Sequence, residues 1–177
     1  MKGFVIWITG LPGSGKSILA DKIKEQMPDI VILRMDELRK IATPDPTYSD
    51  TERSIIYRSL VFTAKKLFNL GHNVIIDATG NLRKYRDFAR EQIPYFAEIF
   101  LSCPIDVCSK REAERTDFRH APKNIYKKGR AGWPVPGISA PYEEPLHPEL
   151  VIDTSITDAS HAAQTAVDFI KKRSVNI

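Results

Sequence analysis

The stretch Gly10-Leu-Pro-Gly-Ser-Gly-Lys-Ser17 sets the fold class of this chain. It matches the pattern G-x-x-x-x-G-K-[ST], follows the apolar run Phe4–Ile8 and opens a helical pattern. Glycines in such a loop let backbone N–H groups converge on phosphate oxygens, and the helix N-terminus adds its positive end. The expected ATP contacts are Gly10, Gly13, Ser14, Gly15, Lys16 and Ser17. Lys16 would reach the β- and γ-phosphates as a catalytic cation, and the Ser17 hydroxyl would bind Mg²⁺.

Short apolar runs alternate with helical patterns on both sides of this loop. The runs are Phe4–Ile8, Ile30–Leu33, Val74–Ile76, Ile99–Leu101 and Leu150–Ile152. The helical patterns are Ser17–Met27, Thr51–Leu70, Leu82–Gln92, residues 105–115 and Ala159–Lys172. Such alternation predicts an α/β protein with three layers, in which helices cover both faces of a parallel sheet of about five strands. Together with the loop, this indicates the P-loop NTPase fold in its nucleotide-kinase-like form.

The 177 residues predict a single domain, residues 1–177, and two irregular stretches interrupt the alternation. These stretches are Thr43–Asp50 and His120–Pro148. Loops of that length in a compact domain are usually functional, so we expect a lid over about residues 111–145. The absence of a guanine-reading Asn-Lys-x-Asp pattern favours a small kinase that uses ATP and Mg²⁺ over a GTPase.

Composition and charge exclude several classes of protein. No apolar run approaches the length of a membrane span, and two cysteines cannot make a disulfide framework. We therefore expect a cytoplasmic protein without a membrane partner. The net charge is +4, and residues 110–130 alone carry eight basic and three acidic side chains. A local basic segment of this kind suits a small anionic acceptor, and nucleic acid is not the expected partner.

Ligands of open α/β sheets bind at the carboxyl ends of the strands, so the residues that follow each apolar run are candidates for the acceptor site. Asp36 and Arg39 follow the second run and would share one helical face. Asp36 is a candidate catalytic residue that would take the acceptor's proton or hold Mg²⁺ through water, and Arg39 would bind an anion. Asp77, after the third run, is a further candidate. The other candidate contacts are Arg53, Arg58, Arg83, Arg86 and Trp133, the last as a surface on which a base could stack.

Further along the chain, the sequence resembles the adenylylsulfate kinase family. The resemblance lies in Lys123-Asn-Ile-Tyr-Lys-Lys-Gly-Arg130, in Gly137-Ile-Ser-Ala-Pro-Tyr-Glu143, in Cys108-x-x-Arg111 and in the last strand up to Thr154. It implies ATP-dependent phosphorylation of the 3′-hydroxyl of adenosine 5′-phosphosulfate, within sulfate assimilation. It also implies that Arg111 and Thr154 contact ATP and that Lys128 and Ile138 contact the acceptor. Family members are commonly dimeric, so a homodimer is expected.

The acceptor side departs from the family pattern and leaves an alternative open. Arg34 and Met35 stand where the family usually has Asp-Gly, and Ile56 stands where it has an asparagine. Asp36-x-x-Arg39 and Asp77-Ala-Thr-Gly-Asn-x-Arg83 resemble the polynucleotide-kinase branch of small P-loop kinases. The alternative is a related kinase that phosphorylates another hydroxyl, on a different nucleotide conjugate, a small metabolite or a nucleic-acid 5′-end.

Overall fold

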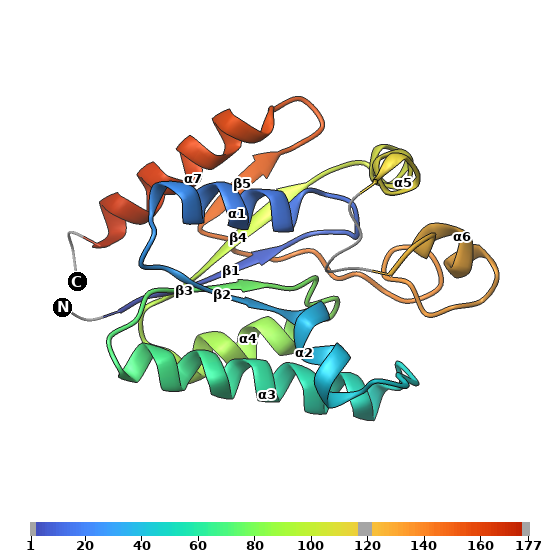
Figure 1. The fold of residues 1–177 in the computed structure, drawn as a ribbon, viewed down its shortest axis with the longest axis horizontal. Helices are drawn as coiled ribbons and strands as arrows, with labels where there is room; N and C mark the ends of the chain where they lie inside the picture. The colour runs from blue at the N-terminus through green and yellow to red at the C-terminus, as the bar shows by residue number, and fades with distance from the viewer. Residues whose placement is uncertain (1–2, 117–121, 175–177) are drawn as a thin grey trace.

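The structure, a computed structural model, describes residues 3–116 and 122–174. Within these residues five strands form one parallel sheet in the order β2-β3-β1-β4-β5 (Figure 1). The strands are β1 (Val5–Thr9), β2 (Val31–Arg34), β3 (Val74–Asp77), β4 (Phe96–Ser102) and β5 (Leu150–Asp153). The helices are α1 (Lys16–Gln26), α2 (Met35–Ala42), α3 (Asp50–Asn69), α4 (Arg83–Gln92), α5 (Ile105–Glu114), α6 (Ile125–Arg130) and α7 (Ala159–Ser174). The predicted α/β class with a five-stranded parallel sheet is confirmed.

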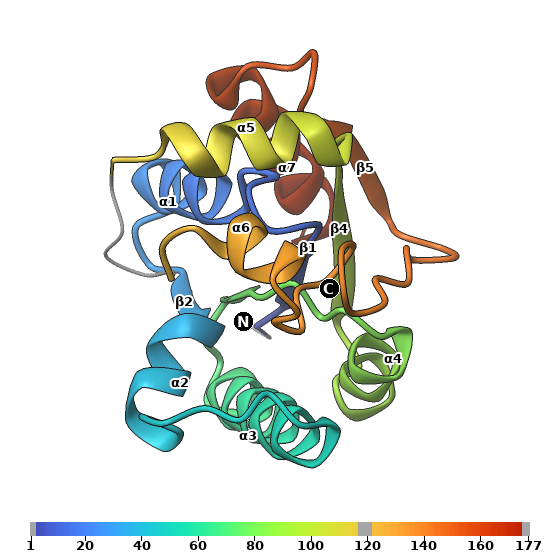
Figure 2. The ribbon, with the colours of Figure 1, turned by 90° about the vertical axis from the view of Figure 1, so that its right-hand side faces the viewer.

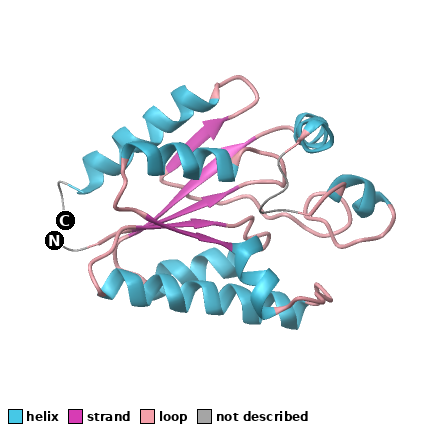
Figure 3. Cartoon of the chain, in the orientation of Figure 1, coloured by secondary structure: helices cyan, strands magenta, loops and turns pink. Residues whose placement is uncertain are grey.

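Helices cover both faces of the sheet, as the buried apolar runs predict (Figure 3). Along β1 the side chains alternate between two apolar layers. Ile6 and Ile8 pack with α1 and α7, whereas Val5 and Trp7 pack with α3 and α4. All five residues of β1 are buried, which is why its sequence shows an unbroken apolar run and not an alternating one.

The carboxyl ends of the strands meet at one edge of the sheet. Asp77 at the end of β3 is in register with Ile8 of β1 on one side and with Arg34 of β2 on the other. Figure 2 looks onto this edge, where α2, α5 and α6 lie around the strand ends. The phosphate loop after β1 and the residues after β2 and β3 are therefore neighbours, as the topology requires.

Three elements differ from the expectations. β4 extends from Phe96 to Ser102, well beyond the apolar run 99–101, because the buried Glu98 interrupts the apolar pattern. α2 forms a helix of eight residues directly after β2, where the sequence analysis expected only that Asp36 and Arg39 share one helical face. α6 lies inside a stretch that was expected to be irregular, and its Gly129 lets Val135 approach: a Cβ there would lie 2.9 Å from that side chain.

None of the helices in the described ranges is long and apolar enough to cross a membrane. The expected lid includes α6, whereas its residues 117–121 lie outside the described residues.

Candidate active site

The phosphate loop joins β1 to α1 and is shaped by its glycines. Gly15 occupies the N-cap of α1 with φ 98°, a left-handed conformation that other residues adopt only at a cost. Gly13 has φ 82°, and a Cβ at this position would lie 2.4 Å from the Cys108 carbonyl oxygen. The loop is thus packed against α5 on one side. The N–H groups of the first turn of α1 have no partner within the helix and can bind a ligand. This is the arrangement that binds phosphate.

Lys16 is buried at the start of α1 and belongs to a charged cluster. Its Nζ donates hydrogen bonds to the carbonyls of Gly10 and Leu11, at 3.0 and 2.8 Å. Burial lowers the pKa of Lys16, and the carboxylates of Asp77 and Asp36 act against that effect. The ammonium group is therefore close to two carboxylates that come from two other strand ends.

Asp36 lies in the first turn of α2, directly after β2. Burial raises the pKa of Asp36 to about 6, and the negative charge of Asp77 adds to this rise while Lys16 and Arg39 oppose it. A carboxylate with a pKa in this range accepts a proton more readily than an ordinary aspartate and is still ionised at neutral pH. Asp36 therefore has the properties expected of a general base.

Asp77 is held by an arginine that the sequence analysis did not select as a site residue. Arg34 Nη1 lies 3.1 Å from Asp77 Oδ2, and both side chains are at most 9% exposed. Arg34 also forms ion pairs with Asp21 of α1 and with Glu37 of α2. It thereby joins α1, α2 and β3 beneath the phosphate loop. A charged residue at the end of an apolar run was the available signal.

A second group of cations and aromatic rings forms the predicted acceptor side. The rings of Tyr48 and Trp133 are 5.4 Å apart, and the Arg39 guanidinium lies 4.9 Å from the Tyr48 ring. Lys128 Nζ lies 4.7 Å above the Trp133 ring. Arg53 donates to the Tyr48 carbonyl at 3.0 Å and to the Pro134 carbonyl at 2.6 Å, so it ties α3 to the loop that carries Trp133. We call Tyr48, Trp133, Arg39, Arg53 and Lys128 the acceptor cluster.

Tyr48 is the residue of this cluster that the sequence analysis missed. It has φ 55°, an uncommon conformation for a residue with a side chain, and such residues concentrate at functional sites. Ser49 is the N-cap of α3, and its Oγ accepts a hydrogen bond from Glu52 N at 3.3 Å. Glu52 also accepts from Arg39 at 2.7 Å. The pattern Ser-x-x-Glu directly after an aromatic residue was the sequence signal that could have identified Tyr48.

Arg111 and Thr154, which the family resemblance assigns to ATP, contact each other beside the phosphate loop. Arg111 Nη2 donates to the Thr154 carbonyl at 2.7 Å, and the Thr154 hydroxyl donates to the Ser14 carbonyl at 3.0 Å. Thr154 thus contacts the loop and Arg111 contacts Thr154, although the two residues are 43 apart in the sequence. Tyr126 of α6 reaches the same loop, where its hydroxyl donates to the Pro12 carbonyl at 2.6 Å.

Other candidates are not brought into this cluster. Arg58 is exposed and lies 4.4 Å from the Phe88 ring, in the groove between α3 and α4. Arg83 is 38% exposed and faces Glu143. Arg86 is 1% exposed and paired with Glu98, so the expectation that it binds an anionic ligand is wrong. Ile138 is 37% exposed and packs against α6 near Gly129.

The fold and the loop define a P-loop phosphotransferase. Arg111 and Thr154 lie on one side of the strand ends, and the acceptor cluster lies on the other. The model of the adenylylsulphate kinase family matches residues 2–153. The chain belongs to the adenylylsulfate kinase family, whose enzymes transfer phosphate to an alcohol group.

Known relatives extend this similarity over nearly the full chain. The adenylyl-sulfate kinase of Bacillus velezensis is 35% identical, over 96% of this chain and 86% of the relative. A probable adenylyl-sulfate kinase of Archaeoglobus fulgidus is 33% identical, over 88% of this chain and 98% of the relative. The solved Mycobacterium tuberculosis APS kinase CysC, in complex with AMPPNP and APS, superposes with a TM-score of 0.85 at 29% identity. That superposition covers 96% of this chain and 98% of the neighbour.

Proposed function

We propose that this chain transfers the γ-phosphoryl group of ATP to the 3′-hydroxyl of adenosine 5′-phosphosulfate, giving 3′-phosphoadenylylsulfate and ADP. The observation that carries the proposal is the acceptor cluster next to Asp36. Tyr48 and Trp133 offer aromatic faces for an adenine ring, and Arg39, Arg53 and Lys128 offer positive charge for the phosphosulfate. Family membership supports the same acceptor.

On the donor side, the phosphates of ATP would lie along residues 10–17, at the N-terminus of α1. Lys16 would exchange its two carbonyl contacts for the β- and γ-phosphate oxygens and so stabilise the charge of the transferring group. Arg111 and Thr154, which are joined to each other and to Ser14, would line the nucleotide side of the loop.

The residues present also fit a magnesium ion. Mg²⁺ in kinases is held by one or two protein oxygens, the phosphates and water. The Ser17 hydroxyl and the Asp36 carboxylate are suitable donors, and the mutual repulsion of Asp36 and Asp77 is what a dication would relieve. When bound, the ion would neutralise charge on the β- and γ-phosphates.

Asp36 would act as the general base of the transfer. Its carboxylate accepts the proton of the acceptor's 3′-hydroxyl as that oxygen bonds to the γ-phosphorus and the bond to ADP breaks. Phosphoryl transfer needs little covalent assistance, so most of the rate would come from alignment and charge. The lid, about residues 111–145, would close over the substrates and keep out the water that otherwise hydrolyses ATP.

The proposed enzyme is a cytoplasmic homodimer. The resemblance to a family of commonly dimeric enzymes supports a homodimer, which light scattering would test. An enzyme that consumes ATP would work in the cytoplasm.

The decisive experiment is coupled ADP release with Mg·ATP and a panel of alcohol acceptors. The panel contains adenosine 5′-phosphosulfate, a second nucleotide conjugate, a small sugar acid and an oligonucleotide with a free 5′-hydroxyl. We expect turnover with the phosphosulfate and little with the others. Turnover with a different acceptor and none with the phosphosulfate would contradict the proposed substrate and leave the kinase assignment in place.

A further inference from the structure

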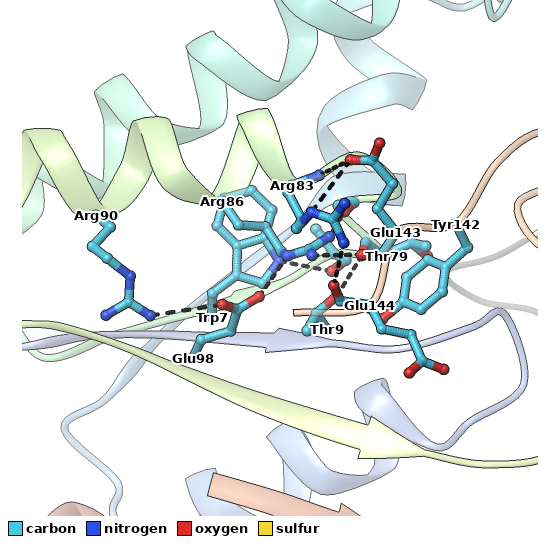
Figure 4. A network of polar contacts seen from close by, with 12 residues as sticks. Trp7, Thr9, Thr79, Arg83, Arg86, Arg90, Glu98, Tyr142, Glu143 and Glu144 are labelled. Carbon is cyan, nitrogen blue, oxygen red and sulfur yellow. Dashed lines mark hydrogen bonds and ion pairs between the residues drawn. The ribbon is translucent and has the colours of Figure 1, made fainter. Parts of the chain in front are cut away.

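The turn between β3 and α4, residues 78–81, is held in place from outside. Its four carbonyls each accept a hydrogen bond from a different residue, and most of these contacts are drawn in Figure 4. The donors are Trp7 Nε1 to Ala78 (2.8 Å), Thr9 Oγ1 to Thr79 (2.6 Å), Arg86 Nη1 to Gly80, and the Glu143 amide to Asn81 (2.8 Å). The turn that directly follows Asp77 therefore has a shape imposed by β1, α4 and residue 143.

Arg86 is the centre of this network. Its guanidinium pairs with Glu98 of β4 at 2.5 Å, and its Nη2 donates to the Glu143 carbonyl at 2.6 Å. Both side chains of the ion pair are at most 6% exposed. Because burying two charges is costly without further hydrogen bonds, the backbone carbonyls of Gly80 and Glu143 are part of what makes the pair stable. Arg86 thus links β4, the turn and residue 143.

Residues 141–143 form the segment by which the chain returns from the Trp133 loop to the sheet. The Tyr142 hydroxyl lies 3.1 Å from the hydroxyl of Thr9, the residue just before the phosphate loop. Asn81 Nδ2 donates to the Pro141 carbonyl at 3.1 Å. At the other end of the same loop, Arg53 holds the Pro134 carbonyl at 2.6 Å. The loop that follows Trp133 is consequently fixed at one end by Arg53 of α3 and at the other end by Arg86 of α4.

We propose that Arg86 is a positioning residue for the acceptor substrate. It acts through the backbone: by holding the 78–81 turn and residues 141–143 together, it keeps Trp133 facing Tyr48 across the acceptor cluster. The inference rests on the proposed function, since it names a residue that prepares that site. Arg86 is not assigned a contact with substrate.

Arg90 provides a matched control within the same network. It lies one turn further along α4, is 39% exposed, and pairs with Glu98 at 3.6 Å and with Glu149. These two ion pairs do not reach the turn or residues 141–143. Arg90→Gln removes a positive charge beside Glu98, whereas Arg86→Lys keeps the charge there and loses the guanidinium that reaches the carbonyls of Gly80 and Glu143.

The experiment compares the two variants with the wild-type protein by steady-state kinetics and by hydrogen exchange without substrate. We expect Arg86→Lys to raise the KM for the acceptor on the order of tenfold or more, with the KM for ATP unchanged. Amide exchange over residues 134–143 should accelerate in this variant. Arg90→Gln should lower the melting temperature without either effect. Tyr142→Phe, which removes only the hydroxyl contact to Thr9, should raise the acceptor KM by a smaller factor.

The outcomes separate the positioning role from the proposed function. Equal behaviour of Arg86→Lys and Arg90→Gln, or a rise in both KM values for Arg86→Lys, would overturn the inference. If Arg86→Lys does not fold, the result for Tyr142→Phe decides: an unchanged acceptor KM and unchanged exchange overturn the inference. A wild-type protein that is inactive on adenosine 5′-phosphosulfate contradicts the proposed function alone, because the exchange measurement needs no acceptor.

Discussion

Lys16 is placed by the phosphate loop but is not needed to shape it. The glycines set the backbone, and burial of the ammonium group lowers its pKa, which means that the charge is held at a cost. We expect Lys16→Ala to fold normally and to lose turnover on the order of 10³-fold, because one preorganised cation of the transition state is missing. Circular dichroism and coupled ADP release test this. A variant that retains most of its activity with any acceptor would disprove the assignment of the loop.

Replacing the carboxylate of Asp36 should slow the transfer step. As a general base it receives the acceptor's proton, so Asp36→Asn should lower kcat by roughly 10²–10⁴ while the KM for ATP changes little. Steady-state kinetics with the acceptor at saturation measure this effect. A loss below tenfold would reduce Asp36 to a positioning role.

The same substitution has a consequence for stability that depends on pH. Burial raises the pKa of Asp36 to about 6 in the folded protein, whereas the unfolded value is 3.8. The folded state therefore binds more protons between these values, and ionised Asp36 destabilises it above pH 6. Asp36→Asn should increase the free energy of unfolding by about 3 kcal/mol at pH 8, because each pKa unit corresponds to about 1.4 kcal/mol, and the gain should fall towards zero below about pH 4. Urea titrations at both pH values test the sign; a loss of stability at pH 8 contradicts the raised pKa.

At the scale of elements, the relevant contact is between the loop before α3 and the loop after α6. Tyr48 and Trp133 meet there, and the exposed fraction of Trp133, 42%, leaves ring surface open to a ligand. Stacking of a base on an aromatic ring contributes about 1–3 kcal/mol. Trp133→Ala should therefore raise the KM for the acceptor about tenfold to a hundredfold and leave the KM for ATP unchanged.

Two matched variants give this prediction its controls. Trp133→Phe keeps an aromatic face and should recover most of the lost affinity for the acceptor. Phe62→Ala removes an exposed ring on the outer side of α3 and should change neither KM. Equal loss of ATP and acceptor binding in Trp133→Ala would indicate that the loop is disturbed as a whole.

At the scale of the molecule, the proposed sites for the two substrates lie at one edge of the sheet, around the carboxyl ends of the strands (Figure 2). A ligand that binds only the folded state stabilises it by about 2.7 kcal/mol at a concentration of 100 Kd. For a chain of this size, that corresponds to a rise in melting temperature of roughly 5–10 °C. We expect this rise with Mg²⁺ and a non-hydrolysable ATP analogue, measured by differential scanning fluorimetry. Lys16→Ala should show a much smaller shift, and an equal shift would place the nucleotide elsewhere.

Much of the molecule can be predicted from local sequence patterns. The phosphate loop is continuous, so eight consecutive residues contain its backbone requirements and its cation. Apolar runs located β1, β2, β3 and β5 to within one or two residues, although only β1 and β3 of these four are fully buried. The ends of parallel strands share one edge of the sheet. The predicted strand ends therefore place Asp36, Arg39 and Asp77 near one another at that edge.

Long-range packing determines the rest. Arg34 and Asp77 are 43 residues apart, and Arg86 reaches Glu143 over 57 residues. Neither pair can be recognised from propensity or periodicity, because an arginine has the same local pattern whether it binds a ligand or an interior carboxylate. The sequence alone therefore establishes the fold, the nucleotide loop and the family. The tertiary structure distinguishes the arginines that face the acceptor from those that hold the scaffold, since only folding determines which charges are buried together.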